Sequence, residues 1–98
     1  MYQLQIRKLA KEDIQDIVDY YDENASTFVT DRFLENLFTE FEYIKSKPKS
    51  FQVKYKNTRV RYLKSFSFGI HYRIKENSII EILAILHTSR RPKTWKKR

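Results

Sequence analysis

Ninety-eight residues suffice for one small domain, and a hydrophobic content of 41% with fifteen Phe, Tyr and Trp residues is enough to fill one core. The absence of cysteine excludes disulfides and cysteine zinc sites, two histidines are too few for a metal cluster, and no apolar run is long enough for a signal peptide or a membrane span. With the net charge of +8, these features predict a basic cytoplasmic protein that is one domain over residues 1–98 and has no metal, cofactor or membrane partner.

The N-terminal segment predicts a strand followed by a helix. Residues 2–6 alternate between apolar and polar side chains, a period of two that is typical of a half-buried strand. From Lys11 the apolar residues recur at helical spacing, with Glu12 and Asp13 expected in the first turn, where carboxylates complement the helix dipole. Asn24 is the expected left-handed residue that terminates this helix.

A second helix is predicted between Ala25 and Pro48. Ser26 or Thr27 can cap its N-terminus, and an apolar stripe rich in aromatic residues follows. Proline ends the helix because it lacks the backbone N–H and restricts the preceding residue. The two helices should therefore form a hairpin with a very short connection.

The remainder of the chain predicts strands. Residues 59–62 alternate, with Val60 and Tyr62 as the apolar positions, and residues 66–74 have one apolar and one polar face. Glu76 and Asn77 are expected to form a tight turn in which Asn takes a positive φ, and residues 79–86 are apolar on nearly both faces, as in a central strand. The order β-α-α-β-β-β predicts an α+β fold, with the helical hairpin on one face of a small, mostly antiparallel sheet and the other face at least partly open.

Charge is divided unequally along the chain. Residues 1–46 carry ten Asp and Glu against five Lys and Arg, whereas residues 47–98 carry two against fifteen. A working surface for a polyanion or an acidic protein is therefore expected in the second half, with Arg73 and the basic side chains before it converging with the tail on the open side of the sheet. A solvated tail is the alternative for any single tail residue, and for Trp95 we favour packing of the tail back onto the sheet. The candidate target- or nucleic-acid-binding residues are Arg59, Arg61, Lys64, Arg90, Arg91, Lys93, Trp95 and Arg98.

Acid–base chemistry has few candidates. His87, at the predicted end of the central strand, is of a residue type that exchanges protons near neutral pH, and metal-independent RNA cleavage also needs a second acid–base group and cations around the phosphate. Glu81 is the nearby acid, but six residues of straight strand separate it from His87 by about 20 Å, which excludes a direct pair. His71 can approach Glu81 across the hairpin, where a cross-strand ion pair is the favoured role. The single glycine excludes a Gly-rich phosphate loop.

These residues resemble the RelE/ParE toxin superfamily over essentially the whole chain. The resemblance is carried by Arg-Val-Arg-Tyr-Leu at 59–63, by Phe-Gly-Ile-His-Tyr-Arg-Ile at 68–74 and, most specifically, by Ile-Leu-Ala-Ile-Leu-His-Thr-Ser-Arg-Arg-Pro-Lys-Thr-Trp at 82–95. A strand that ends in His and is followed by a basic pair and a Pro-x-x-Trp ending is similar to the ParE-like, plasmid-stabilisation branch more than to the ribosome-dependent nucleases.

The resemblance implies the toxin of a bacterial type II toxin–antitoxin pair, held inactive by a cognate antitoxin that is small, acidic and partly disordered. ParE-like members poison DNA gyrase, whereas RelE-like members cut mRNA on the ribosome. For a nuclease, the resemblance assigns Arg61 and Arg73 as phosphate-stabilising cations and His87 as a proton donor. The basic tail has no tyrosine and residues 47–75 contain no acid, which departs from the nuclease pattern.

Three hypotheses follow. The leading one is a non-catalytic toxin that arrests growth through DNA gyrase. The second is an enzyme, a metal-independent, ribosome-dependent mRNA endoribonuclease. The third is an inactive family member that acts only as an antitoxin- or nucleic-acid-binding module.

Overall fold

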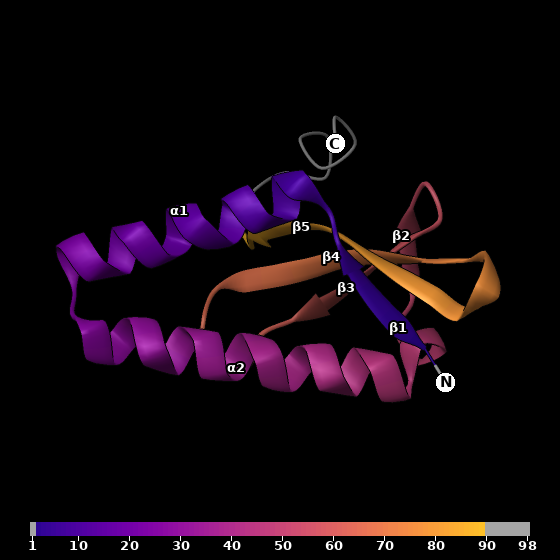
Figure 1. Ribbon diagram of the computed structural model, residues 1–98, viewed down its shortest axis with the longest axis horizontal. Helices are drawn as coiled ribbons and strands as arrows, with labels where there is room; N and C mark the ends of the chain where they lie inside the picture. The colour runs from indigo at the N-terminus through magenta and orange to yellow at the C-terminus, as the bar shows by residue number, and fades with distance from the viewer. Residues whose placement is uncertain (1, 90–98) are drawn as a thin grey trace.

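The computed structural model describes residues 2–89, in which two antiparallel helices pack against one face of a five-stranded sheet (Figure 1). The predicted α+β fold and element order are confirmed, with one further short strand, β2, that the sequence analysis missed. No helix in residues 2–89 is both long and apolar enough to cross a bilayer. In chain order the helices and strands are β1 (Gln3–Ile6), α1 (Lys8–Asn24), α2 (Thr27–Ser46), β2 (Val53–Tyr55), β3 (Thr58–Tyr62), β4 (Phe68–Lys75) and β5 (Ile79–His87).

The sheet has the strand order β1-β5-β4-β3-β2. β1 pairs with β5 in parallel, and the other three pairs are antiparallel. β5 therefore lies between β1 and β4, which confirms the prediction of a central strand from its apolar residues. β1 pairs only with the first part of β5, from Ile79 to Ile82, so α1 rather than a strand flanks the rest of β5.

The first helix begins and ends differently from the prediction. α1 starts at Lys8, so Glu12 and Asp13 lie beyond its first turn. Ala10, in that first turn, is already fully buried. Asn24 was wrongly predicted to terminate the helix in a left-handed conformation. It is the last helical residue, and its side-chain amide donates to the carbonyl oxygen of Tyr20 at 2.9 Å.

The second helix begins as predicted. Ser26 is its N-cap, and the Ser26 Oγ accepts a hydrogen bond from the backbone N–H of Val29 at 3.3 Å. The helix ends before Pro48, and the connection to α1 consists of two residues. Near this connection the Thr30 hydroxyl donates to Asp22 at 2.6 Å, which ties the two helices together.

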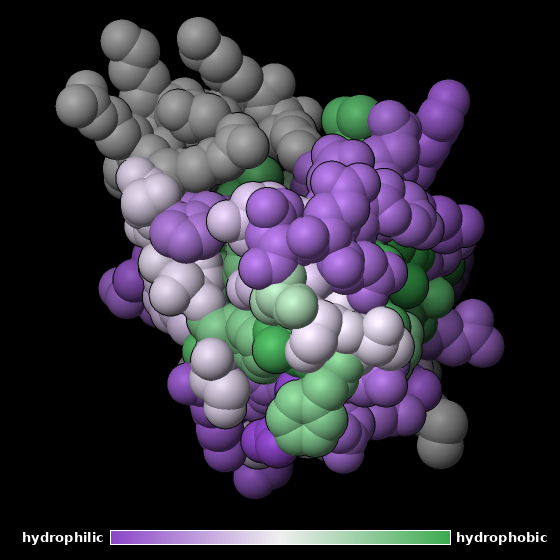
Figure 2. All heavy atoms as spheres, turned by 90° about the vertical axis from the view of Figure 1, so that its left-hand side faces the viewer, coloured by the Kyte–Doolittle hydropathy of each residue, from purple (hydrophilic) through white to green (hydrophobic). Residues whose placement is uncertain are grey.

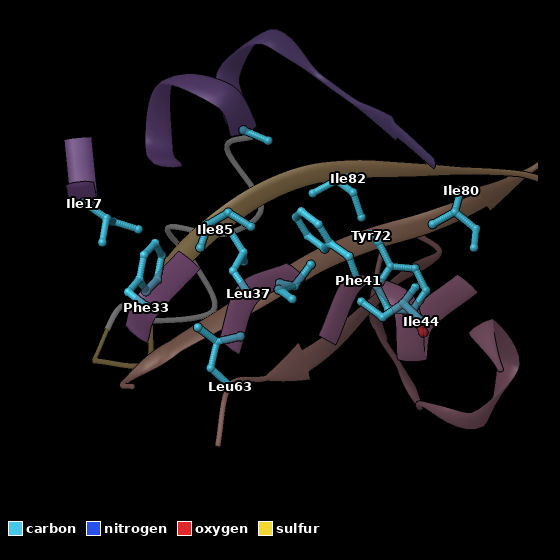
Figure 3. Packing of buried hydrophobic residues seen from close by; sticks show 12 residues of the cluster. Ile17, Phe33, Leu37, Phe41, Ile44, Leu63, Tyr72, Ile80, Ile82 and Ile85 are labelled. Atoms are coloured by element: carbon cyan, nitrogen blue, oxygen red, sulfur yellow. The ribbon is translucent and has the colours of Figure 1, made fainter. Parts of the chain in front are cut away.

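The core lies between the helices and the sheet (Figure 3). The predicted apolar stripe of α2 is confirmed, since Phe33, Leu37, Phe41 and Ile44 are all buried. Each such side chain contributes about 1.5–3 kcal/mol when it is removed from water. Tyr72 is fully buried in β4; its hydroxyl donates to the carbonyl oxygen of Pro48 at 2.6 Å, and burial raises its pKa to about 12.

A bulge in β5 decides which residues share a face of the sheet. His71 pairs with Ala84 and Tyr72 with Ile82, so Leu83 is an extra residue with no partner in the register. Residues after the bulge change face relative to those before it. The turn between β4 and β5 is confirmed, with Asn77 at φ 60°.

Gly69→Ala is expected to lower the free energy of unfolding by about 1–3 kcal/mol. Gly69 faces Tyr62 in the register, and a Cβ at this position would lie 2.9 Å from Val60 Cγ1 and 3.2 Å from Tyr62 Cδ1. Chemical denaturation followed by circular dichroism measures the change. Ser67→Ala, at an exposed position just before β4, is the control with little expected effect; equal stability of both variants would show that the strands move apart at no cost.

Candidate functional site

Arg59 and Arg61 lie on the face of the sheet that is opposite to the one predicted. In the register Arg59 pairs with Tyr72 and Arg61 with Ile70, both core residues that face the helices. The expectation that these arginines converge with Arg73 on the open face was therefore wrong. It took Val60 and Tyr62 as the core positions of β3 because they are apolar, whereas the arginines occupy the helix-facing side at the edge of the core.

Arg61 joins β3 to α2. Its Nε lies 2.6 Å from Oε1 of Glu40, a residue that is only 2% exposed. The guanidinium also lies 4.8 Å from the ring centroid of Tyr43 and 4.7 Å from that of Phe51. Arg59 donates from Nη1 to the Phe51 carbonyl oxygen. Both arginines thus have structural partners at the edge of the helix layer.

Glu81 is the centre of a charge cluster on the open face. It is 3% exposed and its cross-strand partner is Arg73, whose Nε lies 2.6 Å from Oε1. Arg7 Nη1 and Lys75 Nζ lie 3.2 and 3.6 Å from Oε2. Burial alone would raise the pKa of Glu81, but the hydrogen bond from Arg73 and the charges of Arg73, Lys75 and Arg7 lower it below its ordinary value.

His71 does not make the predicted ion pair with Glu81. It pairs with Ala84 in the register, and its Nδ1 lies 2.8 Å from the hydroxyl of Tyr55. His71 is 1% exposed and Tyr55 is half-buried, so this contact between β4 and β2 is partly buried. The prediction was wrong because the turn between β4 and β5 sets a register in which Glu81 lies opposite Arg73, two residues from His71.

A pocket of about 260 Å³, here named the basic pocket, opens beside this cluster. It receives four cationic side chains and no carboxylate. The first turn of α1 forms part of its wall, and no side chain caps that turn, so the positive end of the helix dipole is directed here. The basic pocket is suited to an anionic group of a ligand. It is lined by Arg7, Lys8, Leu9, Tyr55, Lys56, Thr58, Arg73 and Leu83.

Of the cations that line the basic pocket, only Arg73 was singled out by sequence reasoning. Arg7 and Lys8 reach it because β1 runs parallel to β5, which brings Arg7 within 3.2 Å of a carboxylate 74 residues away. No local pattern contains that information. Lys56 lies in the tight connection between β2 and β3, where its φ is 37°.

The other predicted site residues lie elsewhere. His87 is exposed at the end of β5; its ring lies 5.2 Å from that of Phe68 and its Nδ1 2.7 Å from the Ser89 Oγ. After the bulge His87 is on the helix side, so it and Glu81 point to opposite faces. Lys64 lines a shallow pocket beside α2. The candidates Arg90, Arg91, Lys93, Trp95 and Arg98 lie outside the described residues.

The three side chains that a nuclease would use are thus not brought together. Arg61 and His87 lie on the helix side of the sheet, and Arg73 lies on the open side. Within residues 2–89, no three His, Asp or Glu side chains are grouped so that they could hold a metal ion.

Comparison with known proteins agrees with the fold. A family model described as "ParE toxin of type II toxin-antitoxin system, parDE" matches residues 4–92. A structure titled "Chromosomal ParDE TA system from P. aeruginosa" is 17% identical with a TM-score of 0.80, covering 91% of this chain and 98% of that one. The isolated E. coli RelE toxin is 10% identical with a TM-score of 0.62, covering 99% and 95%. A search of curated protein sequences gave no match.

Proposed function

Because this chain belongs to the ParE toxin family of type II toxin–antitoxin systems, we propose that it arrests growth by binding DNA gyrase and that a cognate antitoxin neutralises it. The observation that carries the non-catalytic part of the proposal is the state of Glu81. The open face presents cationic side chains to an acidic partner. The carboxylate on that face, Glu81, is already bound by Arg7, Arg73 and Lys75. A carboxylate whose pKa is lowered by three cations is a poor general base for RNA cleavage.

The alternative, an mRNA endoribonuclease, has less support. It would need Arg61, Arg73 and His87 around one phosphate, and a reacting phosphate needs its cations and proton donors within hydrogen-bond reach. Arg61 is bound to Glu40 on the helix side, and Arg73 is bound to Glu81 on the open side. The sheet itself stands between them.

The direct test is inhibition of purified gyrase. The protein, added in molar excess to gyrase, ATP and relaxed plasmid, should block supercoiling, and an equimolar amount of the antitoxin should restore it. The Gly69→Ala variant, tested below its unfolding temperature, should inhibit equally, because Gly69 is buried in a strand that is paired on both sides. Full supercoiling at a large excess of folded protein would refute the gyrase part of the proposal.

The basic pocket provides a test of the antitoxin part. Lys8→Glu is expected to weaken antitoxin binding about tenfold, because it places a negative charge where an acidic segment would lie. Isothermal titration calorimetry at low and high salt measures the change, which should shrink as salt screens the charges. Lys11→Glu is the matched control, an exposed lysine of the same helix that does not line the pocket. Equal weakening by both variants would mean that net charge, and not the pocket, governs binding.

A further inference from the structure

One stripe of α1 is acidic although the chain as a whole is strongly basic. Glu12, Asp16, Asp19 and Glu23 follow one another at spacings of four, three and four residues, which places them on one side of the helix. All four are exposed. Within residues 2–89 none of the four lies within ion-pair distance of a Lys or Arg. Gln15 Nε2 donates to Asp19 Oδ1 at 2.8 Å, but this stripe, the acidic ridge, has no cationic partner in the described part of the chain.

An apolar groove of about 490 Å³ opens beside Asp16 of the acidic ridge. Its floor consists of Ile17, Tyr21 and Phe68, and its rims are Asp16 and Tyr20 on one side and His87 on the other. Tyr20 is 61% exposed although it is a large aromatic residue. Figure 2, which looks onto the end of the molecule formed by the helical hairpin, shows apolar side chains gathered between hydrophilic ones.

The sheet topology explains why this groove exists. β1 ends opposite Ile82, so the last residues of β5 have α1 as their neighbour. Asp13 takes the place of a missing strand there, because its Oδ2 accepts a hydrogen bond from the backbone N–H of Ile85 at 3.0 Å. The hydrogen bond holds α1 beside the end of β5, and the groove lies between these two elements.

We propose that the acidic ridge and the apolar groove together bind a basic peptide segment of a partner protein. One large apolar side chain of the segment enters the groove between Tyr20 and His87, and its Lys or Arg side chains pair with Asp16 and Asp19. The exposed Tyr20 ring adds a face on which a guanidinium stacks. This is the arrangement of an amphipathic segment laid into a groove beside a charged rim.

The acidic ridge and the basic pocket carry opposite charges. A nucleic acid or an acidic segment is repelled by four carboxylates in one stripe, whereas the same ligands are attracted to the basic pocket on the open face. The two surfaces therefore take ligands of opposite sign. The inference does not depend on whether the toxin acts on gyrase.

The test uses two labelled peptides with the same leucines, one with lysines and one with glutamates at the polar positions. Fluorescence anisotropy should show binding of the lysine peptide to the whole chain and at least tenfold weaker binding to the double variant Asp16→Lys/Asp19→Lys. The matched control is Asp31→Lys/Glu42→Lys, two exposed acids of α2 outside the groove, which has the same change in net charge. Tyr20→Ala should weaken binding without changing charge.

Several results would overturn the proposal. These are failure of the lysine peptide to bind, equal loss in both charge variants, or equal affinity of the double variant and the unmodified chain. Amide chemical shifts that move on β3 and β4 instead of on α1 would also overturn it. Because all four sites of charge reversal are exposed, the variants should keep the melting temperature of the unmodified chain, which each titration must verify.

Discussion

Arg61→Ala should lower the free energy of unfolding by about 3–5 kcal/mol, because it breaks a buried ion pair by removing one partner. The substitution leaves Glu40, a side chain 3% exposed, without the cation at 2.6 Å that compensates its burial. It also removes the stacking of the guanidinium between Tyr43 and Phe51. Urea denaturation at neutral pH measures the loss.

A double variant separates the buried charge from the lost contact. Glu40→Leu/Arg61→Leu replaces the pair by apolar side chains that leave no buried charge and should recover most of the stability, since apolar replacements of buried ion pairs are often neutral. If the double variant is as unstable as Arg61→Ala, the loss comes from the missing contacts of the Arg61 side chain and not from the unpaired charge of Glu40. Because Arg61→Ala is expected to be much less stable, a loss of toxicity in this variant is evidence for a catalytic role only when the folded fraction has been measured.

Glu81→Gln is expected to lower stability by about 2 kcal/mol at neutral pH, because three cations lose their common counter-charge. The carboxylate also has a predictable pH dependence. Its pKa is lower in the folded chain than in the unfolded one, so its contribution is complete above the ordinary glutamate value of about 4.3 and is lost as the pH falls through the folded value.

Denaturation curves between neutral and acidic pH test the direction in which stability changes with pH. The unmodified chain should lose stability on acidification below about pH 4, and Glu81→Gln should lose less over the same interval. Glu42→Gln, an exposed glutamate of α2, should retain the full pH dependence. An unchanged slope in Glu81→Gln would show that other carboxylates carry the acid sensitivity.

The periodicity of apolar residues was sufficient to predict the helices and most strands. Phe33 to Ile44 predicted the buried stripe of α2, and the apolar run of β5 predicted its central position, because both depend on burial alone. The three residues of β2 were missed because they are too few to show an alternation.

The faces of the sheet were less predictable from the sequence. Arg61 was assigned to the open side because it alternates with the apolar Val60 and Tyr62, yet Glu40 and two aromatic rings of distant segments provide a site for it on the helix side. One extra residue, Leu83, reverses the face of His87 relative to Glu81. Arg7 reaches the charge cluster only because β1 pairs in parallel with β5, which is far from it in the sequence. Such contacts are set by tertiary packing and leave no local pattern.

The most direct test of the proposed function is inducible expression without antitoxin, with growth, DNA synthesis and the integrity of a translated mRNA followed in one culture. A non-catalytic toxin that acts on gyrase should stop DNA synthesis first and leave the mRNA intact. Prompt cleavage of the mRNA would contradict this account and establish the nuclease, and unaffected growth would contradict it in favour of a binding module.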